Sequence, residues 1–245
     1  MIAICSKRSA RLKKFIIIAN GPFLNRDILV EAIQDRQIIA LDGAADKLLA
    51  LGITPHIILG DFDSIHPHTQ AHWGIIENFQ TLSDHALPYT GQHGVLIVPA
   101  KDQMFTDLSK AIHYCDAQQA QEISIICATG GRDDHHEANK LALQQAYRKH
   151  RPIMLYGEQQ TLRWAENEVV TLHGEIGDYC GYIAQNPGYG DSIGLAYPCV
   201  QTPVSLCNRL SAQTAYVTIT GSALVIMPTQ LQAQRRWLKN VNALI

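Results

Sequence analysis

The sequence predicts an α/β protein with a largely parallel sheet in its first part and a smaller antiparallel β-sandwich in its second part. From Phe15 to Tyr156, short apolar runs alternate with helical patterns, which is typical of βαβ units. From about Gln160 onward, glycine and proline separate short β-rich segments, and helical periodicity is nearly absent. We therefore expect an α/β domain at residues 15–158 and a β-sandwich domain at residues 159–245.

The first part is expected to begin with a strand, because Phe15–Ala19 is a β-branched apolar run that Asn-Gly-Pro follows. Gly52 stands where a helix C-cap is expected, and Thr106 can cap a later helix. Residues 66–94 are rich in His, Gly and Pro and predict an irregular segment. The expected elements are strands 15–19, 37–41, 57–59, 95–98, 123–128 and 152–156, and helices 27–35, 44–51, 107–117 and 134–149.

The second part is expected to hold short strands at 169–173, 192–197, 216–220 and 224–227. A final helical pattern lies in QLQAQRRWLKN, residues 230–240.

The amino-acid composition limits the classes of protein and partner that can be expected. Of 245 residues, 47% are hydrophobic and 17% charged, so a packed core is expected. The net charge of −2 gives no reason to expect nucleic acid or an anionic membrane as a partner. The basic start precedes an apolar run too short for a signal peptide or a membrane span, so residues 1–14 predict a solvated tail. Six scattered cysteines without C-x-x-C indicate reduced thiols and a cytoplasmic location.

Acidic and glycine-rich segments follow four of the expected strands. In open α/β sheets, ligands bind outside the carboxyl ends of the strands, so these segments are expected to meet at one edge. They are Asp42-Gly43, Gly60–Ser64, Asp102–Asp107 and Gly130–Asp134.

Asp61 and Asp63 predict a metal site. In an extended segment, residues i and i+2 point to the same side, about 6.5–7 Å apart. Their carboxylates repel each other, and a divalent cation removes that repulsion. Hard oxygen ligands suit Mg²⁺, and Asp107 can complete the cluster. The alternative for each aspartate alone is a turn or a helix cap.

The segment TGGRDDHHEAN predicts an anion site. Gly130 and Gly131 let backbone N–H groups approach an anion at a strand-to-helix turn. Arg132 can hold a phosphate with two hydrogen bonds, and Asp134 can cap the helix or bind a ligand. Because no Walker-type loop is present, metal and positioning are expected to drive a phosphoryl-type transfer.

Five segments in order resemble the motifs of the thiamine pyrophosphokinase family. They are LDGAADKLLALGITPHIILGDFDSI (41–65), KDQMFTDLSKAI (101–112), GGRDDHHEAN (130–139), GLAYPC (194–199) and SLCN (205–208). Cys207 stands where the family usually has a second serine.

The resemblance implies a homodimer with sites at the subunit interface. It also implies transfer of the pyrophosphoryl group of ATP to the hydroxyethyl oxygen of thiamine, giving thiamine diphosphate and AMP. By position, Asp61, Asp63 and Asp107 would hold Mg²⁺, and Ser205 and Asn208 would approach thiamine. The ATP and transfer site would be lined by Asp42, Gly43, Gln103, Thr106, Gly130, Gly131, Arg132 and Asp134.

Two other functions stay open from the sequence. One is pyrophosphoryl transfer to another acceptor, such as a hydroxymethylpterin. The other is a nucleotide-binding protein of the same fold without catalysis.

Overall fold

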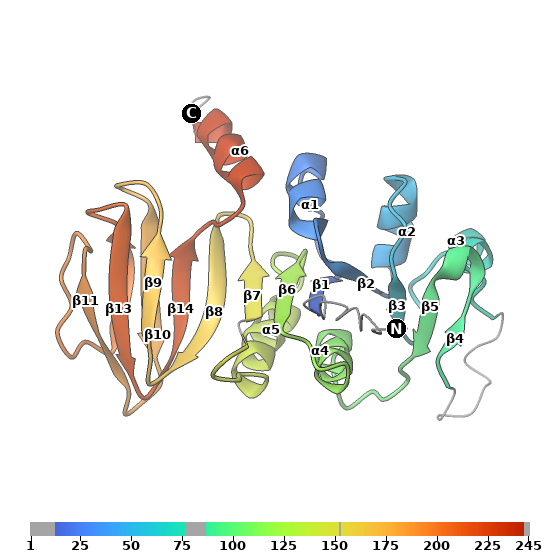
Figure 1. Cartoon of the computed structure of the whole chain (residues 1–245), viewed down its shortest axis with the longest axis horizontal. Coiled ribbons are helices and arrows are strands. Elements are labelled where there is room, and N and C mark those ends of the chain that lie inside the picture. The colour runs from blue at the N-terminus through green and yellow to red at the C-terminus, as the bar shows by residue number, and fades with distance from the viewer. Residues whose placement is uncertain (1–12, 77–86, 152, 243–245) are drawn as a thin grey trace, which may run out of the picture.

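The computed structural model describes residues 13–76, 87–151 and 153–242 (Figure 1). Its first part alternates strands and helices along the chain. In order these are β1 (Lys14–Ile18), α1 (Arg26–Ile33), β2 (Gln37–Leu41), α2 (Ala44–Ala50), β3 (Ile57–Gly60), α3 (Pro67–Trp73), β4 (Tyr89–Thr90), the 3-10 helix η2 (Gln92–Gly94), β5 (Leu96–Pro99), α4 (Asp107–Ala117), β6 (Glu122–Ile126), α5 (Asp133–Gln145) and β7 (Ile153–Tyr156).

The second part is built from strands and ends in one helix. In order these are β8 (Gln160–Glu166), β9 (Val169–His173), β10 (Tyr179–Ala184), β11 (Tyr189–Ile193), β12 (Val204–Arg209), β13 (Thr214–Thr220), β14 (Ser222–Pro228) and α6 (Gln232–Asn242). Within the described residues, eleven strands form one sheet in the order β12-β10-β14-β8-β7-β6-β1-β2-β3-β5-β4. A second sheet has the order β11-β13-β9 and is antiparallel.

Six strands in the centre of the large sheet run parallel, in the order β5-β3-β2-β1-β6-β7. Strand β1 lies between β2 and β6, with Phe15 opposite Gln37 on one side and Ile123 on the other. The chain adds β2, β3 and β5 on one side of β1 and then crosses to add β6 and β7 on the other. The β1–β6 boundary is therefore the topological switch point, where doubly wound sheets bind ligands.

Both faces of the parallel strands are apolar and covered by helices, as buried parallel sheets require. Phe15 and Ile17 pack in one core cluster with residues of α4 and α5. Ile16 and Ile18 point to the opposite face and pack in another cluster with residues of α1 and α2. The alternation follows from the two-residue period of a strand, and it makes continuous isoleucine runs the natural sequence for β1.

The large sheet continues without a break into the second part of the chain. Strand β8 pairs antiparallel to β7, with Leu155 opposite Leu162, and β14, β10 and β12 follow. A third core cluster joins this part of the sheet to the three-stranded sheet. The fold class expected from the sequence is confirmed. The expected domain boundary at residues 158 and 159 falls in the turn between β7 and β8 and stays a prediction.

Several expected elements differ from the structure. Within the segment expected to be irregular, Pro67–Trp73 is helical, because Pro67 suits the first helical turn, Trp73 is buried and Gly74 provides a left-handed C-cap. Residues 77–86 of that segment lie outside the described residues. The helix expected at 134–149 ends at Gln145.

The antiparallel part was predicted less well. The strand expected at 192–197 is instead β11, which ends before Gly194, whose φ is +84°. Strands β8, β10 and β12 were not expected. Each contains polar residues or glycine, and its place in the sheet depends on neighbours far away in the sequence.

Three further expectations concern the start of the chain, its cysteines and a membrane span. Residues 1–12 of the expected tail lie outside the described residues. Lys14 begins β1 and its ammonium group lies 3.3 Å from Glu122, so Lys14 belongs to the sheet and not to a solvated tail. The five described cysteines are free, as the sequence indicated. No helix in the described part of the chain is long and apolar enough to cross a membrane.

Candidate active site

A pocket of about 670 Å³ opens at the carboxyl ends of the parallel strands. Its walls come from the segments that follow β1, β2, β3, β5 and β6. It therefore lies over the switch point between β1 and β6, and the four motif segments predicted to meet at this edge all lie at the pocket or beside it.

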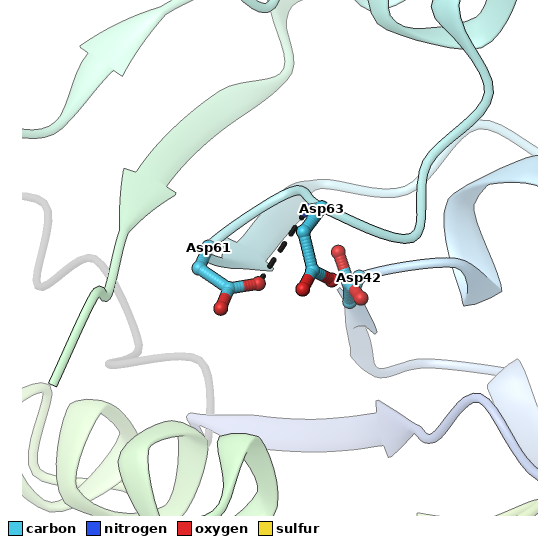
Figure 2. Close-up of side chains that lie close together, drawn as sticks. All are labelled: Asp42, Asp61 and Asp63. Atoms are coloured by element: carbon cyan, nitrogen blue, oxygen red, sulfur yellow. Dashed lines mark hydrogen bonds between the residues drawn. The ribbon is translucent and has the colours of Figure 1, made fainter. Parts of the chain in front are cut away.

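Three carboxylates gather beside this pocket (Figure 2). Asp42 follows β2, and Asp61 and Asp63 follow β3. Each can offer one oxygen such that all three oxygens lie within 4.8 Å of one another. The backbone N–H of Asp63 donates a 3.4 Å hydrogen bond to Oδ1 of Asp61, which holds the Asp61 carboxylate against the loop that carries Asp63.

Asp42 is the buried member of the group. It is 6% exposed, and the hydroxyl of Ser64 donates a hydrogen bond to its Oδ2. Its Oδ1 is buried without a hydrogen-bond partner among the described residues. Burial raises the pKa of Asp42 to about 7, and the negative charges of Asp61, Asp107 and Asp63 add to this effect. A bound cation would satisfy the orphan oxygen and offset the repulsion, so the three side chains fit a hard divalent ion.

The backbone is strained just after the ends of β2, β3 and β6. Asp42, Phe62 and Cys127 have φ angles of +46°, +65° and +57°, and each stands one or two residues after the end of a strand. A left-handed conformation costs a non-glycine residue about 1–2 kcal/mol. Such strain persists where the surrounding structure enforces it, and it is typical of ligand sites.

The segment between β5 and α4 forms another wall. Thr106 caps α4 through a 3.2 Å hydrogen bond from the backbone N–H of Ser109, as predicted. The Gln103 side-chain amide donates to Oδ2 of Asp61 at 2.9 Å. Asp107 pairs with Lys110 at 3.0 Å. The structure thus joins Asp42, rather than Asp107, to the oxygen cluster of Asp61 and Asp63.

The turn that starts α5 also lines the pocket. Gly130 and Gly131 both have φ of +79°, a conformation that glycine adopts without a steric cost. Arg132 donates to Asp134 through Nε at 3.1 Å and through a terminal nitrogen at 2.6 Å. The hydrogen bond from Arg132 is the main cause that lowers the pKa of Asp134 to about 2. Both side chains are exposed, and Arg132 lines the pocket, whereas Asp134 does not.

The loop after β1 forms the floor. A Cβ atom at Gly21 would lie 2.3 Å from the carbonyl oxygen of Cys127, so only glycine allows this close contact. The Lys47 ammonium group donates to the carbonyls of Asn20 and Gly21 at 2.9 and 2.8 Å. Burial lowers the pKa of Lys47. Gly43 packs against the Asn20 side chain of this loop, because a Cβ atom added to Gly43 would lie 2.5 Å from the Asn20 amide nitrogen.

Sequence reasoning did not select four polar side chains that line the pocket: Asn20, Lys47, Lys110 and Asn139. Lys47, Lys110 and Asn139 lie within the motif segments 41–65, 101–112 and 130–139, so their place in the sequence could have identified them as candidate pocket residues. Asn139 is 9% exposed and donates to the carbonyl of Ala128 at 2.7 Å, which ties α5 to the end of β6.

Residues 31–155 match the family model described as the catalytic domain of thiamin pyrophosphokinase. The chain belongs to the thiamin pyrophosphokinase family. The match covers half of the chain and includes β2, β3, α4, the glycine turn and the three carboxylates.

Solved structures with thiamin pyrophosphokinase names share the fold. The enzyme from Bacillus subtilis is 23% identical with a TM-score of 0.71, and 89% of this chain aligns with all of that chain. The protein from Geobacillus thermodenitrificans is 23% identical with a TM-score of 0.68, covering 89% of this chain and 99% of that one. The Candida albicans protein is 18% identical with a TM-score of 0.68, covering 89% and 90%. No curated protein sequence matches this chain.

Two residues expected from the thiamin pyrophosphokinase motifs do not line this pocket. Ser205 and Asn208 are 7% and 2% exposed on β12. Asn208 donates to the Ser205 hydroxyl at 3.0 Å and to the carbonyl of Tyr197 at 2.7 Å, and it accepts from the Tyr197 N–H at 3.0 Å. The motif therefore ties β12 to the GLAYPC segment.

Proposed function

We propose that this chain is a thiamine pyrophosphokinase, which transfers the pyrophosphoryl group of ATP to the hydroxyethyl oxygen of thiamine and releases AMP. One observation carries the proposal beyond family membership. A carboxylate cluster and a glycine turn at a helix N-terminus face the same pocket at the switch point of the sheet. Such a pocket suits a polyphosphate that binds through a metal ion on one side and N–H groups on the other.

The metal would be Mg²⁺. Asp42, Asp61 and Asp63 would hold it, and Asp107 would join them on releasing Lys110. When bound, Mg²⁺ neutralises phosphate charge and orients the phosphates. The orphan oxygen and the raised pKa of Asp42 support this assignment. The oxygen lacks a donor among the described residues, and burial together with the neighbouring carboxylates disfavours the ionised form, so a bound cation would relieve both.

The other residues would bind and orient the substrates. Gly130 and Gly131 offer N–H groups to phosphate oxygens, and Arg132 would exchange Asp134 for a phosphate as charge develops. Gln103 orients Asp61, and Thr106 fixes the start of α4, which carries Asp107. One carboxylate of the cluster would accept the hydroxyl proton of thiamine as its oxygen attacks the β-phosphorus of ATP in line. Most of the rate increase would come from positioning.

The thiamine site is proposed to form in a homodimer, with Ser205 and Asn208 near the thiamine of the partner subunit. An apolar face supports association of the β-rich parts. Ile183 on β10 lies opposite Val204 on β12, and these side chains and Leu206 are 40%, 44% and 52% exposed. Apolar side chains gathered on one sheet face are typical of an interface. The cytoplasmic location expected from the free cysteines stays a prediction.

The decisive experiment is to incubate the protein with ATP, Mg²⁺ and an acceptor, and to follow AMP and thiamine diphosphate. Thiamine-dependent release of both products supports the proposal. AMP release that requires a hydroxymethylpterin instead would favour the other acceptor. Tight ATP binding with no AMP from either acceptor would favour a non-catalytic nucleotide-binding protein.

A further inference from the structure

The C-terminal helix α6 returns to the α/β part and is anchored there at its first turn. Figure 1 shows α6 on the same side of the sheet as α1. The carboxylate of Glu31 on α1 accepts hydrogen bonds from the backbone N–H groups of Gln232 at 2.8 Å and Ala233 at 2.6 Å. These N–H groups have no partner within their own helix, so a carboxylate from another helix caps α6.

A second anchor joins α6 to the turn between β7 and β8. The side chain of Gln234 is completely buried. Its amide nitrogen donates to the carbonyls of Gly157 at 2.5 Å and Glu158 at 2.6 Å, and its oxygen accepts from the Thr229 hydroxyl. A buried amide with all these partners holds one arrangement, because any other leaves polar groups unsatisfied.

That turn packs against the glycine turn of the active-site pocket. A Cβ atom built on Gly157 would lie 3.5 Å from the hydroxyl of Thr129, and one on Gly130 would lie 3.7 Å from the Glu158 carboxylate. The same Cβ atom on Gly130 would lie 3.3 Å from Pro22. Pro22 belongs to the loop that leads into α1, the helix that carries Glu31.

We propose that α6 clamps the glycine turn in its phosphate-binding conformation, with Gln234 and Glu31 as positioning residues. Gln234 fixes the turn at Gly157 and Glu158, which packs against the glycine turn. Glu31 joins α6 to α1, the helix that follows the loop of Pro22. Neither side chain lines the pocket, so both act through the backbone segments that they hold. The proposal rests on the proposed function only in taking the ligand of this turn to be the phosphates of ATP.

The test compares Gln234→Met with Gln232→Ala. Methionine keeps the volume of glutamine and removes the donors to Gly157 and Glu158, whereas the side chain of Gln232 is exposed. We expect Gln234→Met to raise the KM for ATP about tenfold with a smaller change in the KM for thiamine, because small misplacements of a binding group weaken binding strongly. Amide exchange in residues 128–132 should become faster. Gln232→Ala should behave like the wild type.

Glu31 provides a second pair of variants that does not alter the buried core around Gln234. Glu31→Ala should raise the KM for ATP, and Glu31→Gln should restore part of the wild-type value, because its carbonyl oxygen still accepts from the helix. A purely structural role would lower Tm in these variants and leave the KM for ATP and the exchange of residues 128–132 unchanged at temperatures well below Tm.

Wild-type exchange in residues 128–132 in both Gln234→Met and Glu31→Ala would overturn the clamp. This readout needs no catalysis. If the wild-type protein produced no AMP from ATP and thiamine, the proposed function would fail while the exchange measurement still decided whether α6 holds the turn.

Discussion

The ammonium nitrogen of Lys110 lies 3.0 Å from Oδ1 of Asp107 and also donates to the carbonyl of Ala100 at 2.8 Å. Asp107 therefore has a cation partner from its own helix. Asp42, Asp61 and Asp63 instead bring their oxygens together. The sequence pattern assigns Asp61, Asp63 and Asp107 the same role as metal ligands. Their different surroundings instead predict that Asp61 and Asp63 contribute more to metal affinity than Asp107 does.

The first prediction concerns metal affinity. We expect Asp61→Asn and Asp63→Asn to weaken Mn²⁺ binding at least about tenfold and to lower turnover at least about 100-fold, since each removes a charge from the cluster. Asp107→Asn should weaken Mn²⁺ binding less than about threefold in the absence of ATP, because Lys110 already neutralises that carboxylate. Electron paramagnetic resonance of bound Mn²⁺ measures all three affinities. A larger loss in Asp107→Asn than in Asp61→Asn would contradict the assignment.

The second prediction concerns the guanidinium of Arg132. We expect Arg132→Ala to lower kcat/KM for ATP about 100-fold, and Arg132→Lys to recover less than half of that loss on a logarithmic scale, because an ammonium group cannot form the paired hydrogen bonds of a guanidinium. Steady-state kinetics at varied ATP measures this. Arg148→Ala is the matched control, since Arg148 is also an exposed arginine paired with an aspartate, Asp116. Full rescue by lysine would show that charge alone matters.

The third prediction concerns Asn208, whose side chain bonds both the N–H and the carbonyl of Tyr197. Asn208 is 2% exposed, and its side chain also donates to the Ser205 hydroxyl at 3.0 Å. Asn208→Ala removes these three hydrogen bonds, each of which contributes about 1 kcal/mol, so we expect a loss of about 2–3 kcal/mol in the free energy of unfolding. Urea unfolding measures this. Cys207→Ser, at the exposed neighbouring residue, should change stability by less than about 0.5 kcal/mol. Wild-type stability in Asn208→Ala would show that these bonds are not structural.

The fourth prediction concerns pH and Glu122, which pairs with Arg36 at 2.5 Å and with Lys14 at 3.3 Å. Burial opposes ionisation of Glu122, but the hydrogen bonds and charges of Arg36 and Lys14 outweigh it and lower its pKa. Because the pKa is lower in the folded state, the pair stabilises the fold above the ordinary glutamate pKa of about 4.3. That stabilisation is lost as the pH falls through the folded-state pKa.

Glu122→Gln should therefore reduce the free energy of unfolding by about 1–2 kcal/mol at pH 7. The difference from wild type should shrink as the pH falls below about 4.3. Urea unfolding at several pH values measures it. Glu137→Gln, which removes an exposed pair with Lys140, should cost less than about 0.5 kcal/mol at any pH. A gap between wild type and Glu122→Gln that stayed constant down to acid pH would contradict the prediction.

The parallel half of the fold could be predicted because its signals are local. Runs such as Phe15–Ala19 are apolar on both faces. Thr106 marks the start of α4, and Gly52 marks the end of α2, each through contacts within a few residues. The antiparallel half was predicted only in part. The strands expected at 169–173, 216–220 and 224–227 correspond to β9, β13 and β14, whereas β10 and β12 owe their place to partners far away in the sequence.

The sequence by itself determined the family, the parallel α/β class and the meeting of four motif segments at one edge of the sheet. The family follows from the resemblance of five ordered segments to the motifs of known members. The fold class follows from short-range periodicity, and the meeting of the segments follows from the rule that parallel strands present their carboxyl ends together. Only the tertiary structure decided that Asp42 rather than Asp107 completes the carboxylate cluster, that Lys47 supports the floor, and that Gln234 reaches the turn beside Gly130. Those contacts join residues from separate elements, and their distances depend on packing and strained loop backbones, which no spacing along the chain specifies.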